Sequence, residues 1–156
     1  MGTSMLRPVV YERRRGTTAV EFAITCPIVF FFVFAIIVGG LGVFRYQQVG
    51  SAAREGARWA SVHGRDYADE TKKPAATPAD VFNQAILPLA VALDPNYLTY
   101  SVTWNKSNKP LEVSVGGYET PIGNTVTVTV TYQWFPELLL VGPFTLSSTS
   151  TAQMVY

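Results

Sequence analysis

The most constraining feature of this sequence is an uncharged stretch that runs from Phe22 to Phe44 and reads FAITCPIVFFFVFAIIVGGLGVF. As an α-helix, these 23 residues reach about 35 Å, enough to cross the roughly 30 Å hydrocarbon layer of a bilayer. A buried helix of a soluble protein seldom has more than about 14 apolar residues in a row. The stretch therefore predicts a membrane-spanning helix over about residues 22–44.

A cleaved secretory signal is one alternative explanation of this stretch. The apolar region of such a signal has about 7–15 residues and ends at small side chains. Here the stretch is longer, and it ends in Val43, Phe44 and Arg45. We therefore expect the helix to remain in the protein.

Charge is distributed unevenly around the span. Residues 1–16 hold four arginines and one glutamate, a net charge of +3, and the rest of the chain holds 8 Lys+Arg and 10 Asp+Glu, a net charge of −2. Basic residues favour the cytoplasmic side of a membrane, and only the segment after Phe44 is long enough to fold. We expect a single-pass protein with a cytoplasmic N-terminus and a periplasmic or extracellular C-terminal domain.

The composition argues against several classes of function. The net charge of +1 provides no basic face for nucleic acid, and the chain has one histidine, His63, and one cysteine, Cys26. Cys26 lies in the middle of the span, where a cysteine acts as a small apolar side chain and needs no chemical role. No phosphate loop, CxxC or HExxH motif occurs. We expect no enzymatic activity, metal, cofactor, nucleic-acid partner or small-molecule substrate.

The residues just before the span form an unusual group. Three arginines, Arg13 to Arg15, precede Gly16, and Glu21 begins the uncharged helix. Glycine suits a scissile bond because it has no side chain, and cleavage after it makes Thr17 the first residue. The freed α-amine and Glu21 have opposite charges and can pair. Alternatively, Glu21 simply lies among the headgroups, near the positive end of the helix.

This segment resembles the processing site of type IV pilin-like proteins, which prepilin peptidase cleaves after the glycine. The sequence RRGTTAVEFA over residues 14–23, followed by Pro27, is most similar to the TadE-like pseudopilin family, and residues 51–61 resemble the family's small-residue helix. The resemblance covers residues 13–63. The residues fit a TadE-like and a TadF-like subunit equally.

The resemblance implies a minor pilin-like subunit of a Tad-type pilus assembly or secretion system, located in the bacterial inner membrane. It implies cleavage by prepilin peptidase between Gly16 and Thr17, and a role for Glu21 in setting the register of an incoming subunit. Other pilin-like subunits and the pilus assembly machinery are the implied partners, and pilus biogenesis and adhesion the implied role. The alternative is an ordinary single-pass protein with an uncleaved leader and an outer domain that binds a ligand or partner.

The helix is expected to continue beyond the span. Pro27 should kink it inside the membrane. After Phe44, small residues recur at intervals of three and four, which allows another helix or the protein's own sheet to approach closely; this packing stripe comprises Ala53, Gly56, Ala57 and Ala60. We therefore divide the chain into a basic leader (1–16), an N-terminal helix (17–63) and a head (64–156).

The head is predicted to be α+β. Gly64 should end the first helix, and residues 64–78 should form a solvated loop, because the spacing of Asp66, Asp69 and Glu70 does not match the EF-hand calcium template. Thr77 and Pro78 are typical of a helix start.

Four strands are expected after this second helix. Residues 98–104 and 111–115 flank an expected turn, residues 125–134 alternate Val and Thr with a period of two, and residues 144–156 are a softer candidate. These strands predict a three- to four-stranded antiparallel sheet that is polar on one face and covered by helices on the other.

Overall fold

The computed structural model describes residues 15–106, 108, 111–136 and 142–155. Within the expected leader, residues 1–14 lie outside the described residues. The chain divides into two compact units, residues 1–37 and 38–156, and the helix α1 (Arg15–Val62) contributes residues to both.

The first unit contains the N-terminal part of α1. The apolar helix from Gly16 to Val62 includes an 18-residue window with a mean hydropathy of 2.7, and no part of that window is buried. A core helix of a soluble protein would be covered by other elements, whereas a lipid-facing helix is exposed in the isolated chain. The helix is therefore compatible with single-pass membrane anchoring.

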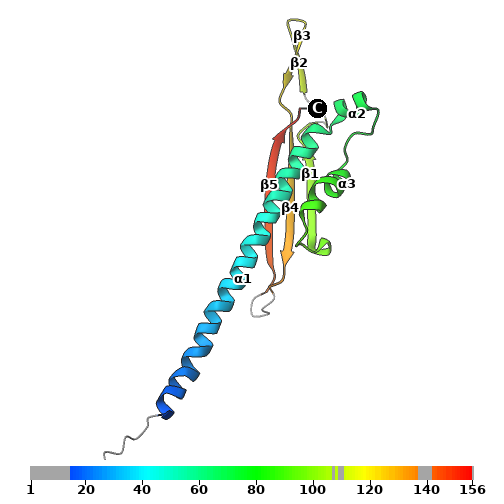
Figure 1. Cartoon of the computed structure of the whole chain (residues 1–156). Coiled ribbons are helices and arrows are strands. Elements are labelled where there is room, and N and C mark those ends of the chain that lie inside the picture. The colour runs from blue at the N-terminus through cyan, green and yellow to red at the C-terminus, as the bar shows by residue number, and fades with distance from the viewer. Residues whose placement is uncertain (1–14, 107, 109–110, 137–141, 156) are drawn as a thin grey trace, which may run out of the picture. The chain divides into compact units, whose positions relative to one another are not determined.

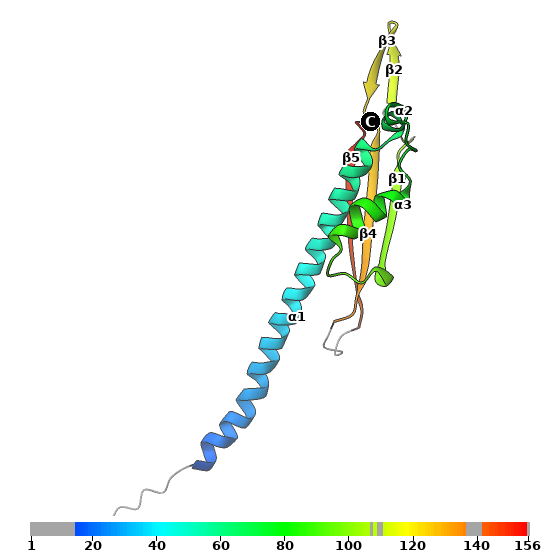
Figure 2. The same ribbon diagram turned by 45° about the vertical axis from the view of Figure 1, so that its right-hand side comes forward.

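The second unit is built on a three-stranded antiparallel sheet. Its order is β1-β4-β5, with β1 at Leu98–Trp104, β4 at Thr125–Trp134 and β5 at Phe144–Gln153. The central strand β4 pairs with β1 through Val102↔Val128 and with β5 through Val128↔Ser150. Figures 1 and 2 show the later part of α1 running along the sheet.

The core of this unit lies between α1 and the inner face of the sheet. The alternation in β4 places its valines inward, and Val126, Val128 and Val130 are fully buried. Ile86, from the second helical segment, completes the contact with the helix and the sheet. The period-two pattern of β4 thus positions α1 on one face.

The opposite face of the sheet is formed by hydroxyl side chains. Three hydrogen bonds between hydroxyl groups join β4 to β5, with oxygen–oxygen distances of 2.9 to 3.1 Å. The pairs are Thr127–Thr151, Thr129–Thr149 and Thr131–Ser147. The three strands contain no charged residue. The prediction of a sheet with one polar face and one helix-covered face is confirmed.

The helix predicted to start at Thr77 and Pro78 begins there. Thr77 caps α3 (Pro78–Val81), and the chain continues through a π-helical segment, η1 (Phe82–Ile86), and a 3-10 turn, η2 (Leu87–Leu89). Pro88 lies in this last turn, which ends the helical segment at Leu89. A second 3-10 turn, η3 (Pro95–Tyr97), leads into β1.

The predicted pairing of the strands is wrong at one place. The strand β2 (Leu111–Val115) pairs with β3 (Tyr118–Ile122) in a separate two-stranded sheet, not with β1. The connection is Gly116-Gly117, and both residues have positive φ angles, 64° and 86°. Glycine adopts such angles without steric cost, so this dipeptide makes the hairpin turn.

Three boundaries also differ from the sequence prediction. A short helix, α2 (Arg65–Thr71), occupies part of the expected loop at residues 64–78, and none of its residues is buried. The helix α1 ends at Val62, and Gly64 caps the start of α2 with φ −78°, so it is not a left-handed terminator of α1. The strand β5 ends at Gln153, three residues before the expected end.

Candidate functional site

The predicted processing residues lie in the first turns of α1. Gly16, Thr17 and Glu21 are all helical and exposed to solvent in the isolated chain. Thr17 and Glu21 are four residues apart, which places their side chains on the same face of the helix. A free amine at Thr17 would therefore lie near the carboxylate of Glu21.

Packing among the described residues does not require a glycine at position 16. A Cβ atom added there meets nothing within 4 Å. Glycine in a helix is less favourable than alanine by about 1 kcal/mol, so the fold alone gives no reason for glycine at this position.

Two features loosen the helix just after Glu21. Pro27 lies inside α1, and a proline has no N–H to donate to the carbonyl four residues earlier. The hydroxyl of Thr25 donates to the backbone carbonyl of Glu21 at 2.8 Å, a type of bond that often bends helices.

The packing stripe of α1 faces the sheet of its own chain. Ala53, Ala57 and Ala60 are buried, and a Cβ atom at Gly56 would lie 3.1 Å from Ile86 Cγ1 and 3.2 Å from Val128 Cγ1. Of the two partners that the sequence leaves open, the described structure supplies the sheet. The small side chains let the helix and the sheet come close enough to exclude water.

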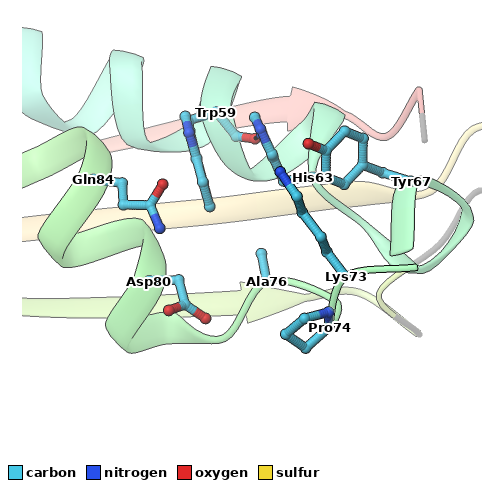
Figure 3. Close-up of a pocket in the computed structure, with 8 residues that line it drawn as sticks. All are labelled: Trp59, His63, Tyr67, Lys73, Pro74, Ala76, Asp80 and Gln84. Carbon is cyan, nitrogen blue, oxygen red and sulfur yellow. Dashed lines mark hydrogen bonds between the residues drawn. The ribbon is translucent and has the colours of Figure 1, made fainter. Parts of the chain in front are cut away.

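A second candidate site lies at the end of α1. A hollow of about 290 Å³ separates the Trp59–His63 pair from α3 and η1. Figure 3 shows Trp59 and His63 on one side of it and Asp80 and Gln84 on the other. The remaining lining residues are Tyr67, Lys73, Pro74 and Ala76.

Two ionisable side chains in this hollow, His63 and Asp80, have structural partners. The His63 ring stacks on Trp59 at 4.0 Å between centroids, and its Nδ1 lies 2.9 Å from the Trp59 carbonyl oxygen. Asp80 accepts hydrogen bonds from the backbone N–H and the hydroxyl of Thr77, which lower the pKa of its carboxyl group. Neither contact aligns the imidazole with the carboxylate as an acid–base pair.

Sequence reasoning missed this hollow. The available signal is the spacing of Trp59, His63 and Tyr67, which recur every four residues. His63 stacks on Trp59 and meets the Tyr67 ring edge-on. Asp66, Asp69 and Glu70 do not gather with other ligands: among the described residues, no group of three or more His, Cys, Asp or Glu side chains is arranged to hold a metal ion.

The comparison with known families identifies the N-terminal segment. Residues 16–58 match the model of the family described as TadE-like protein, which confirms the resemblance over this segment. The match begins at Gly16 and includes Glu21, the apolar stretch and most of the packing stripe. Over this segment the chain is similar to the TadE-like family. No curated protein and no solved structure matches the chain.

Proposed function

We propose that this chain is a minor pilin-like subunit of a Tad-type pilus assembly or secretion system, inserted in the bacterial inner membrane and cleaved by prepilin peptidase after Gly16. One observation supports this proposal most directly. Gly16 begins the TadE-like segment, packs against nothing among the described residues, and lies five positions before a carboxylate at the start of an apolar helix.

The physical chemistry of the segment suits this route. The arginines before Gly16 hold the leader at the anionic cytoplasmic surface, at about 1 kcal/mol each. Hydrolysis of the Gly16–Thr17 peptide bond consumes one water and leaves a carboxylate on Gly16 and an amine on Thr17. That amine and Glu21 then neutralise each other, within one subunit or between two, and this offsets the cost of burying both charges.

The head has a supporting role in this proposal. It carries no enzymatic activity and lies outside the cytoplasm, where it contacts other pilin-like subunits and contributes to pilus biogenesis and adhesion. The packing stripe is used within the head, because Gly56 already lies against Ile86 and Val128. Contacts with other subunits therefore fall on the apolar part of α1 and on the exposed surfaces of the head.

The decisive experiment measures the N-terminus of the membrane-extracted protein by mass spectrometry, in cells with and without prepilin peptidase. We expect Thr17 as the first residue only when the peptidase is present. Gly16→Leu should retain the full leader in both cells. Gly39→Leu is the matched control, because a Cβ atom at Gly39 also meets nothing within 4 Å, and it should be cleaved normally.

An intact leader in both cells would contradict the proposal. The protein would then be a single-pass anchored domain, and the hollow lined by Trp59, His63 and Asp80 would be its first candidate for ligand binding.

A further inference from the structure

A group of aromatic side chains gathers at one end of the sheet. Trp134 ends β4 and pairs in register with Phe144, the first residue of β5, and their rings lie 5.9 Å apart. The ring of Phe135 lies 4.9 Å from that of Tyr97 in η3. We call Tyr97, Trp134, Phe135 and Phe144 the aromatic base.

Most of this aromatic base is exposed. Phe135 and Phe144 expose 46% and 45% of their surface, and Tyr97 exposes 43%. Exposed single aromatics are common on soluble proteins, but contiguous apolar groups mark sites of interaction. The base therefore lacks a partner within the described part of the chain.

The position of the base along α1 indicates the partner. Trp134 packs directly on Gly42, where a Cβ atom would lie only 2.6 Å from the indole ring. Gly42 belongs to the uncharged run that ends at Phe44. Arg45, the first charged residue after the run, lies with its guanidinium carbon 5.3 Å from the centre of the same ring. The base is therefore level with the end of the apolar run and the first charge beyond it.

We infer that the aromatic base rests on the outer interface of the bilayer that α1 spans. The exposed rings of Tyr97, Phe135 and Phe144 lie among the lipid headgroups and upper acyl chains, and the buried Trp134 holds the group against the helix. Tyrosine, here Tyr97, concentrates at this depth because its ring is apolar and its hydroxyl forms hydrogen bonds with headgroups and water. The inference rests on the membrane insertion contained in the proposed function. It adds a second membrane contact, made by the head itself.

Several neighbouring features fit a lipid partner. The strands β1, β4 and β5 themselves contain no charged residue, so the sheet contributes no ion to this end. Asp94 lies just before η3 at this end, and its carboxylate accepts a hydrogen bond from the backbone N–H of Asn96 at 2.9 Å. A charge held on a turn in this way is tolerated in the headgroup region, where water is still present. The glycine at position 42 keeps the base at this level, because a side chain there would push Trp134 away from the helix.

The experiment uses the full chain with one environment-sensitive fluorophore. The only cysteine is first removed as Cys26→Ala, and Phe135→Cys or Phe144→Cys then carries the label. Tyr118→Cys is the matched control, because Tyr118 is an aromatic residue, 81% exposed, in the hairpin β2–β3 at the other end of β4. Each protein is reconstituted into phosphatidylcholine vesicles that contain lipids spin-labelled near the headgroup.

We expect the spin-labelled lipid to quench the labels at 135 and 144 several-fold more strongly than the label at 118. Resistance to alkaline carbonate extraction, measured in the same samples, reports insertion of α1 independently. Equal, weak quenching at all three positions in carbonate-resistant protein would overturn the inference and leave the insertion standing. Loss of carbonate resistance would overturn both. Self-quenching that rises with protein density, without quenching by the lipid, would assign the base to a second copy of the chain and overturn the lipid contact.

Discussion

The role of single residues is clearest at Gly56, where the helix and the sheet meet. A Cβ atom there would lie 3.1 Å from Ile86 and 3.2 Å from Val128, both of which are fully buried. Neither neighbour can move into solvent to make room. The position thus requires glycine because of close approach and not because of backbone conformation.

We expect Gly56→Leu to destabilise the head. Overpacking of this kind costs about 1–3 kcal/mol, which lowers the melting temperature by roughly 2–4 °C per kcal/mol in a chain of this size. Thermal unfolding of the full chain in detergent, followed by circular dichroism, measures the change. Gly40→Leu is the control, because nothing lies within 4 Å of a Cβ atom there. Equal melting temperatures for the two variants would contradict the close packing described here.

At the scale of elements, the start of α3 depends on a reciprocal pair of hydrogen bonds. The Thr77 hydroxyl accepts from the backbone N–H of Asp80, and the Asp80 carboxylate accepts from the backbone N–H of Thr77. The hydrogen bonds from Thr77 hold the pKa of Asp80 below its ordinary value of 3.8. A lowered pKa means that the ionised carboxylate stabilises the folded state.

This arrangement predicts a specific pH dependence. The contribution of Asp80 is fully present above pH 3.8, the ordinary pKa of an aspartate, and is lost as the pH falls through its lower value in the folded protein. Asp80→Asn should therefore melt at a lower temperature than the wild type at neutral pH, and the difference should shrink at acidic pH. Melting curves across this range test it. Asp69→Asn, on the exposed helix α2, is the control, and a difference that is constant with pH would refute the prediction.

The sequence is informative about elements with a strong internal pattern. The alternation of Val and Thr in β4 predicts both the strand and its two faces, and the apolar run predicts α1. The helix α2 is missed because its seven residues have no apolar stripe and bury nothing. The strand β3 contains Pro121 and no regular alternation, although Gly116-Gly117 is the turn signal that would have revealed the hairpin.

The candidate sites also differ in whether the sequence reveals them, according to whether their residues are close together or far apart in the chain. Gly16, Thr17 and Glu21 are close in sequence, so a local motif is sufficient to identify them. The hollow near His63 combines the end of α1 with Asp80 and Gln84 of a later helical segment. The aromatic base likewise combines η3, β4 and β5. Long-range pairing brings these residues together, and the sequence pattern does not specify that pairing.

At the scale of the whole molecule, Glu21 links insertion to assembly. It is exposed at the start of α1, and among the described residues no side-chain contact explains a carboxylate at the start of an apolar helix. Removal of one partner from a buried ion pair costs about 3–5 kcal/mol, because the other charge is left without compensation. Under the proposed function, loss of the Glu21 charge would leave the α-amine of Thr17 buried without a partner when a subunit joins its neighbours, and assembly would become less favourable by that amount.

We therefore expect Glu21→Gln to be inserted and cleaved like the wild type, but to enter the assembled pilus complex at least roughly a hundredfold less, which corresponds to about 3 kcal/mol. Immunoblots of the sheared surface fraction and of the membrane fraction measure the distribution. Glu55→Gln is the control, because Glu55 also lies on α1 but pairs with Arg58 at 2.8 Å on the head. Normal incorporation of Glu21→Gln would show that Glu21 is only an interfacial charge, and loss of cleavage would show that it acts on the peptidase step instead of on assembly.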